Sequence, residues 1–231
     1  MSITPFHFFE VLSLEECKEN LSLLDQHSDY WTPRMPGVPF YTLGTPLYMD
    51  KEKPIAIYEK QVIAMNKILR HHFENLLQKA RHCLETHLNS RLLDLPGCSL
   101  PGFHIFGGSI FFTQPIASIH FDLQYQKIRW PEPPSLNSVV SFTLPIVLPT
   151  HGGGLNWWDI EWDSSRSRQE QEKLQSTKTK NYLPYKTGKM VVHNGHLLHQ
   201  IAPATEILSN DRRVTLQGHA TRSGENYYWY W

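Results

Sequence analysis

The feature that most constrains the fold is a series of short extended segments in the second half of the chain, bounded by glycine and proline. Turn signals such as Gly107-Gly108, Gly152-Gly153-Gly154 and Asn194-Gly195 separate these segments. The residue types predict strands at 103–105, 110–113, 118–123, 139–148, 190–193, 197–202 and 213–220. Many short strands with turns between them are typical of a sandwich, jelly roll or barrel.

The first hundred residues are predicted to be mainly helical. Ser13 and Glu16 have the spacing of a capping box, which begins a helix with Cys17 on its apolar face. Residues 32–54 contain several prolines and glycines and are predicted to form a loop. In 55–93 apolar residues recur every three or four positions, which indicates one long helix or two abutting ones.

We therefore expect a mainly β fold with N-terminal helices (α+β) and one domain over 1–231. Residues 1–99 would form a mainly helical support, and 100–231 the β core. The polar segment 159–186 has almost no aliphatic residues and is expected to be an exposed insertion, helical around 168–174. The aromatic segment 227–231 is predicted to be a last strand or an oligomer contact.

Composition excludes several classes of protein. The 22 basic and 22 acidic residues balance, so we expect neither nucleic acid nor an anionic membrane as the main partner. The three cysteines include no C-x-x-C pair, so no disulfide framework or zinc knuckle is indicated. Residues 1–10 lack a signal-peptide pattern, and no apolar run is long enough to span a bilayer. We expect a cytoplasmic protein.

The triplet His120-Phe121-Asp122 lies in a predicted strand. Side chains at i and i+2 project to the same side of a strand, so His120 and Asp122 would lie side by side. Two imidazoles and one carboxylate on one face of an octahedron are the usual ligands of non-haem Fe(II). The triplet is weak evidence alone, because such triplets occur by chance.

The third ligand would come from another strand. His199 shares strand parity with Leu197 and Ile201, so it is predicted to face inward. A lone inward histidine is more often a core residue than a ligand, but the His120–Asp122 pair requires a third ligand. His193 and His196 are alternatives, ranked second and third.

A carboxylate-binding pair is predicted in the last part of the core. Arg213 and Thr215 share one strand face and offer a guanidinium fork and a hydroxyl, which suit a remote carboxylate. Strand alternation allows only one of Arg212 and Arg213 to point inward, and Arg213 is preferred because it shares the face of Thr215. The alternative is an ordinary surface arginine pair.

Together these residues resemble the 2-oxoglutarate-dependent Fe(II) oxygenases. The resemblance consists of His120-x-Asp122, His199 within His-Gln-Ile-Ala-Pro, and Arg213-x-Thr215 fourteen residues later. The glycines at 152–154 and the strand start at 188–190 also match that family's pattern. The match covers roughly 100–222, whereas residues 11–17 are similar to the start of small prolyl-hydroxylase-like members.

The resemblance implies a double-stranded β-helix (jelly roll) braced by helices. It implies that His120, Asp122 and His199 bind Fe(II), and that Arg213 and Thr215 hold the distal carboxylate of the cosubstrate 2-oxoglutarate. The implied reaction is hydroxylation of an unactivated C–H bond by O2, with release of succinate and CO2. Members that accept chlorine lack the carboxylate, so Asp122 favours hydroxylation or another oxidation over halogenation.

The substrate is predicted to be a small molecule, such as an amino acid or a natural-product scaffold. Candidate substrate-binding residues are Tyr125, Trp130, Trp157 and Trp158, for each of which core packing is the alternative. A prolyl-type peptide or protein hydroxylase is a second possibility, and a non-catalytic jelly-roll binding module is a third. His151-Gly152-Gly153-Gly154 is similar to an esterase oxyanion loop, but the chain has no Gly-x-Ser-x-Gly elbow.

Overall fold

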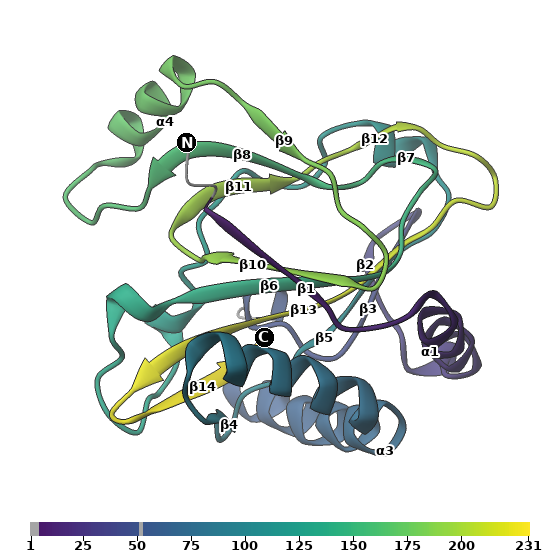
Figure 1. Cartoon of the computed structure of the whole chain (residues 1–231), viewed down its shortest axis with the longest axis horizontal. Helices are drawn as coiled ribbons and strands as arrows, with labels where there is room; N and C mark the ends of the chain where they lie inside the picture. Colours follow the sequence, from purple (N-terminus) through teal and green to yellow (C-terminus); the bar gives the residue numbers. More distant parts are fainter. Residues whose placement is uncertain (1–4, 51–52) are drawn as a thin grey trace.

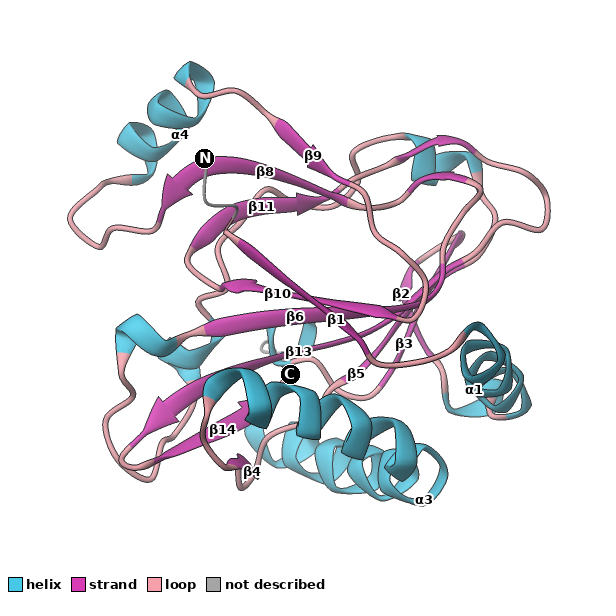
Figure 2. Cartoon of the chain, in the orientation of Figure 1, coloured by secondary structure: helices cyan, strands magenta, loops and turns pink. Residues whose placement is uncertain are grey.

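Two β-sheets face each other, and helices cover the outer side of the larger sheet (Figures 1 and 2). This arrangement is seen in a computed structural model that describes residues 5–50 and 53–231. The path of the larger sheet is β1 (Phe6–Glu10), β10 (Lys189–Asn194), β6 (Val140–Val147), β13 (Arg213–Ser223), β5 (Gly102–Phe106), β3 (Val38–Leu43) and β2 (Thr32–Met35). At one end β13 also pairs with β14 (Asn226–Tyr230), which runs parallel to β4 (Leu92–Asp94).

The smaller sheet contains β11 (Leu197–Ile201), β8 (Leu155–Glu161) and β9 (Asn181–Leu183). A separate ladder joins β12 (Ala204–Glu206) to β7 (His151–Gly152). The helices are α1 (Leu14–Gln26), α2 (Leu47–Asp50), α3 (Ile55–Leu88) and α4 (Arg168–Thr177). Short 3-10 turns occur at η1 (Ser28–Tyr30), η2 (Ile110–Thr113), η3 (Gln124–Lys127) and η4 (Leu136–Ser138).

Helices α1 and α3 form as the sequence predicts. Ser13 caps α1, and the reciprocal bonds between Ser13 and Glu16 complete the capping box. Helix α3 packs its apolar stripe against the larger sheet and has non-helical dihedral angles at Phe73, so it is one helix with a kink. It ends at Asn89, which adopts the left-handed conformation. Among the described residues, no helix is both long and apolar enough to cross a membrane.

Strand alternation divides the larger sheet into two chemically different faces. On β13, Val214 and Leu216 join the core under the helices, whereas Arg213, Thr215, Gln217 and His219 have the opposite parity. The same alternation holds on β5 and β6, where Phe103, Ile105 and Leu144 are core residues. The polar face therefore lies toward the smaller sheet.

Two of the predicted strands do not form. Residues 110–113 are the 3-10 turn η2, because the Ser109 hydroxyl accepts a hydrogen bond from the Phe111 amide and starts a turn. Residues 118–123 make one isolated bridge, between His120 and His199, instead of a ladder. The backbone turns into η3 soon after Asp122. The other five predicted strands correspond to β5, β6, β10, β11 and β13.

The loop predicted over 32–54 was also wrong in part. It contains β2, β3 and α2, while residues 51–52 lie outside the described part of the chain. Pro33 is compatible with β2 because that strand is the edge of the sheet. The strand β1 was likewise not anticipated. The polar segment 159–186 does contain a helix, α4, and the aromatic segment 227–231 does contain a last strand, β14.

Candidate active site

A cavity of about 650 Å³ lies between the two sheets. We call it the central cavity. Its lining includes His120, Asp122 and His199 on one side and Arg213 on another. The β2–β3 hairpin and α2 supply a third wall, with Arg34, Tyr48 and Asp50. The polar face of the larger sheet forms the remaining lining, and a pocket of this size suits a small ligand.

The three predicted metal ligands are brought together. Their ligating atoms all lie within 4.8 Å of one another. Asp122 Oδ1 is 3.6 Å from His120 Nε2, and Asp122 Oδ2 is 3.4 Å from His199 Nε2. Two backbone hydrogen bonds between His120 and His199 align their segments, and the Asp122 amide donates to Gly195 O. The triplet is thus held by β11 and by the turn that precedes it.

Backbone carbonyls fix the tautomers of both imidazoles. His120 Nδ1 lies 2.9 Å from Ser118 O, and His199 Nδ1 lies 2.8 Å from Leu197 O. A carbonyl oxygen can only accept, so each Nδ1 carries the proton and donates it. Each Nε2 then presents a lone pair to the cluster, which is the state that binds a metal.

The charges in the cluster also suit a cation. Burial lowers the pKa of His199 to about 3, despite the attraction of Asp122, so its imidazole is neutral. Burial by itself would raise the pKa of Asp122, but the surrounding imidazoles of His219, His199 and His120 outweigh it and lower that pKa. An ionised carboxylate beside the neutral imidazole of His199 is a pair of metal ligands rather than an ion pair.

A hydroxyl and a third imidazole orient the carboxylate. Ser141 on β6 donates its hydroxyl proton to Asp122 Oδ2 over 2.6 Å. Its oxygen accepts from His219 Nδ1 over 3.0 Å. Gln124 Nε2 donates to the other carboxylate oxygen over 3.3 Å. Neither Ser141 nor His219 was predicted from the sequence, although His219 shares the parity of Arg213 on β13.

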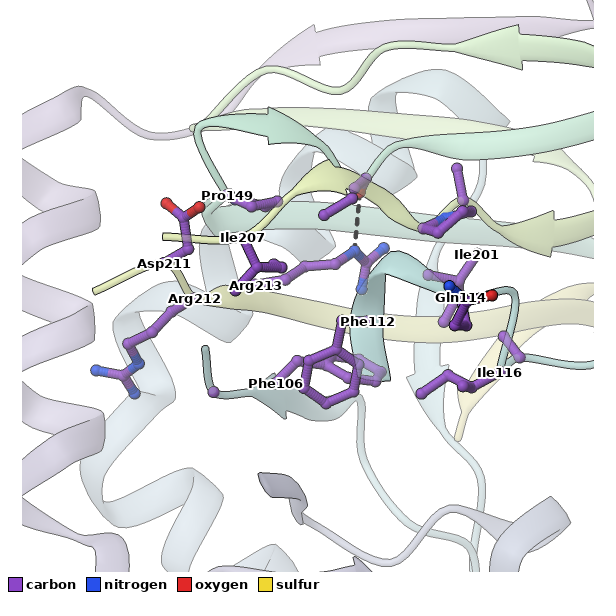
Figure 3. Close-up of a pocket in the computed structure, with 16 residues that line it drawn as sticks. Phe106, Phe112, Gln114, Ile116, Pro149, Ile201, Ile207, Asp211, Arg212 and Arg213 are labelled. Carbon is purple, nitrogen blue, oxygen red and sulfur yellow. Dashed lines mark hydrogen bonds between the residues drawn. The ribbon is translucent and has the colours of Figure 1, made fainter. Parts of the chain in front are cut away.

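The structure separates the two adjacent arginines. Arg213 is 6% exposed and lines the central cavity, where Nε donates to Gly153 O over 2.8 Å. Arg212 points away from Arg213 (Figure 3). It forms a bidentate ion pair with Asp25 on α1. A second pocket, of about 40 Å³, lies beside Arg213 and shares Phe106 and Ile201 with the central cavity (Figure 3).

The guanidinium of Arg213 is only partly satisfied. Nη1 reaches the Thr215 hydroxyl at 3.4 Å, and Nη2 is buried without a hydrogen-bond partner among the described residues. Burial lowers the pKa of Arg213 to about 10, which still leaves it charged at neutral pH. Thr215 is fully buried and also accepts from Gln217, so it supports Arg213 from behind and is not part of the cavity lining.

Of the alternative histidines, one approaches the cluster. His193 lines the cavity, with its ring centroid 4.9 Å from that of His199, and its Nδ1 donates to Asn194 O. His196 is hydrogen-bonded to the Tyr125 hydroxyl at 3.0 Å and does not line the cavity.

The four aromatic residues predicted to bind substrate are not in the lining of the central cavity. Tyr125 is fully buried in a cluster with Tyr230, against which Trp130 packs. Trp158 packs in a separate cluster with Leu198. Trp157 pairs with His199 across the strands but packs against Phe6. The contacts of these four residues are packing contacts, which was the alternative considered for each of them.

The jelly-roll arrangement, with two imidazoles and a carboxylate between its sheets, defines a protein of the Fe(II)/2-oxoglutarate oxygenase class. The chain belongs to one family within that class. The family model described as "Carrier-protein-independent halogenase WelO5" matches residues 6–231. This match confirms the resemblance and extends it to the N-terminal half. No curated protein matches the sequence.

Several solved structures share the fold at low sequence identity. An N-substituted L-amino acid dioxygenase from Burkholderia ambifaria AMMD matches with a TM-score of 0.61 and 12% identity, over 98% of this chain and 86% of that one. The α-ketoglutarate-dependent epimerase SnoN from nogalamycin biosynthesis matches with a TM-score of 0.56 and 11% identity, over 94% and 80%. AviO1 from Streptomyces viridochromogenes Tue57 matches with a TM-score of 0.51 and 14% identity, over 96% and 90%. These matches confirm the predicted jelly-roll core braced by helices.

Proposed function

We propose that this chain is an Fe(II)- and 2-oxoglutarate-dependent dioxygenase that hydroxylates a C–H bond of a small molecule. The observation that carries the proposal is the pair formed by the triad and Arg213 in one cavity. His120, Asp122 and His199 would hold the iron. When bound, the iron and 2-oxoglutarate supply O2 activation, with release of succinate and CO2.

The donor set fits Fe(II). Two imidazole Nε2 lone pairs and one carboxylate converge from one side, and the cavity lies on the other. The carbonyls of Ser118 and Leu197 keep both lone pairs directed inward. Ser141 engages one Asp122 oxygen, which supports binding through the other oxygen and keeps positions open for cosubstrate and O2.

The unsatisfied guanidinium fits the distal carboxylate of 2-oxoglutarate. A buried donor without a partner costs free energy, and a carboxylate in the cavity would accept from Arg213 Nη2. Two related structures support this cosubstrate, since the Burkholderia dioxygenase was solved in complex with α-ketoglutarate and SnoN with Fe3+ and α-ketoglutarate. The role of Thr215 would be to hold Arg213 in place rather than to touch the carboxylate.

Hydroxylation and halogenation are distinguished by Asp122. A halide would have to bind the metal in addition to 2-oxoglutarate and O2, and the carboxylate of Asp122 would occupy the position it needs. The family description favours halogenation as the second candidate function. With chloride present we expect hydroxylated product from the natural chain, and chlorinated product would favour the second candidate.

The size of the cavity supports a small molecule more than a peptide. It lies between the sheets, has a third wall from the β2–β3 hairpin and α2, and its volume of about 650 Å³ suits a small ligand. Two of the similar structures are an N-substituted L-amino acid dioxygenase and the epimerase SnoN from nogalamycin biosynthesis, and both names favour a small-molecule substrate.

The test is succinate formation by the purified chain with Fe(II), 2-oxoglutarate and O2. We expect slow uncoupled turnover that a substrate accelerates, and loss of turnover when iron is omitted. A non-catalytic binding module predicts no succinate with any candidate substrate, and that result would overturn the proposal.

A further inference from the structure

We propose, resting on the function proposed above, that the substrate carries a carboxylate and that Arg34 and Lys53 bind it. These two side chains and Asp50 belong to one side of the central cavity. We call these three residues the cationic wall. It comes from β2, α2 and the short segment that precedes α3.

The cationic wall contains two cations around one carboxylate. Arg34 donates from Nη1 and Nη2 to the two oxygens of Asp50, over 2.9 and 3.0 Å. Lys53 Nζ lies 2.6 Å from Asp50 Oδ1. The Asp50 side chain is 1% exposed. Its single negative charge is shared by the two positive charges of Arg34 and Lys53. The excess of one positive charge distinguishes this wall from a closed structural ion pair.

The charged side chains that line the whole cavity also leave an excess of one positive charge. Its described lining contains three cationic side chains (Arg34, Lys53 and Arg213) and two anionic ones (Asp50 and Asp122). The histidines of the lining are counted as uncharged, the form in which an imidazole binds a metal. Fe(II) and dianionic 2-oxoglutarate add equal and opposite charges. One positive charge is left, and a monoanionic substrate would neutralise it.

The cationic wall also has hydrogen-bond donors that Asp50 and Thr42 do not use. A guanidinium carries five N–H groups, and those of Arg34 that are used go to Asp50 and to the Thr42 hydroxyl, leaving two. Lys53 also donates to Gln61 and is one-third exposed, so it can turn toward a ligand. Two guanidinium donors beside an ammonium group suit a carboxylate.

A polar pair lies on the same side of the cavity. Tyr48 and His104 are hydrogen-bonded at 2.5 Å, and His104 Nδ1 is buried without a partner among the described residues. Burial keeps both groups uncharged, since it raises the pKa of Tyr48 and lowers that of His104. They offer hydrogen bonding but no charge to the body of the substrate, whereas Phe40 and Met35 offer apolar contact.

The experiment uses the full chain and a panel of small carboxylic acids, each matched with its primary amide. The panel contains free amino acids, N-acyl amino acids and simple aliphatic and aromatic acids. We expect acids to stimulate succinate formation at concentrations about tenfold or more below those of their amides, as expected for losing a charged hydrogen bond. The melting temperature of the iron-free chain gives a readout without turnover, and acids should raise it more than amides.

Matched variants locate the effect. Lys53→Glu should raise the half-stimulating concentration of an acid about tenfold or more. Lys60→Glu makes the same charge change at an exposed position of α3 and should leave that concentration unchanged. Arg34→Lys keeps the charge but loses the fork, and it should give an intermediate increase.

Three results would overturn the inference. They are equal stimulation by acids and amides, no stimulation by any acid, and the same effect of Lys53→Glu and Lys60→Glu. The absorption band of Fe(II) with 2-oxoglutarate, measured without O2, reports the proposed function separately. If that band forms but the acids do not stimulate succinate formation, the proposed function stands and only the proposed carboxylate site is wrong. If it does not form, the melting-temperature comparison still decides the inference.

Discussion

Hydrogen bonds from outside the triad set the orientation of each candidate iron ligand. His120 and His199 are fixed by carbonyl oxygens, and Asp122 by Ser141, which in turn accepts from His219. Such partners hold ligands at the geometry that a metal requires before it binds. The site is therefore organised in advance by residues that would not touch the metal.

Replacing Ser141 tests this organisation. Ser141→Ala removes the donor to Asp122 Oδ2 and the acceptor for His219, so the carboxylate gains freedom. We expect Fe(II) affinity to fall roughly 10- to 100-fold, the usual effect of losing such a partner. Equilibrium Fe(II) titration measures it, with Ser176→Ala on exposed α4 as the control. Equal affinities in the two variants would show that Ser141 does not position the ligand.

Replacing the two arginines tests the cosubstrate clamp. Arg213→Met should raise the 2-oxoglutarate concentration for half-maximal turnover roughly 10- to 100-fold, because a charge-assisted pair is lost. Arg212→Met breaks only the surface pair with Asp25 and should leave that concentration nearly unchanged. Steady-state succinate formation provides both values. A larger effect at Arg212 would reverse the assignment.

At the scale of elements, strand parity accounts for much of the site. Parity predicted that Arg213 and Thr215 share a face of β13, and they do. His120 and Asp122 also come together, but on a segment that makes one bridge to β11 and is not a strand. Parity cannot say which strands are neighbours. Ser141 meets His219 only because β6 pairs with β13, and this pairing brings together residues 78 positions apart. That contact was not available from the sequence.

The cationic wall was missed for a different reason. Arg34 and Asp50 lie in a segment whose prolines and glycines resemble those of a loop, yet β2 can form because an edge strand tolerates Pro33. The place of the buried aromatic residues could not be predicted for another reason. Aromatic side chains near a site wall a pocket or fill a core equally well, and Tyr125 and Trp158 fill cores.

Close packing of β5 against the last residue gives a prediction at this scale. A Cβ on Gly102 would lie 2.3 Å from the Trp231 ring and 2.6 Å from the carbonyl oxygen of Leu43. Gly102→Ala should therefore lower the free energy of unfolding by about 1–3 kcal/mol, as overpacking does. In Gly107→Ala, just after β5, the new Cβ would approach Pro39 no closer than 3.1 Å, so the substitution should cost less. Denaturant titration of both variants checks the order, and a reversed order would contradict the packing.

At the scale of the whole molecule, the buried histidines couple stability to pH. Burial lowers the pKa of His104, His193 and His219 below 6.5, and that of His199 to about 3. Below pH 6.5 the unfolded chain binds protons that the folded chain does not, so the free energy of unfolding falls as pH falls. The iron-free protein should thus lose stability between pH 7 and pH 5.

Melting temperatures across this range measure the effect. His104→Gln should make the decline with pH shallower, because it removes one of the buried bases. His82→Gln changes an exposed histidine on α3 and should leave the slope as it is. A melting temperature that stays constant down to pH 5 would contradict the account of these buried imidazoles.

The proposed iron site is tested by an anaerobic absorption titration of the purified chain with Fe(II) and 2-oxoglutarate. We predict that one Fe(II) binds per chain and that 2-oxoglutarate then produces a visible metal-to-ligand charge-transfer band. The band should be lost in His199→Ala. If no band forms in the natural chain, or if His199→Ala retains it with unchanged iron affinity, then His120, Asp122 and His199 are not the iron site.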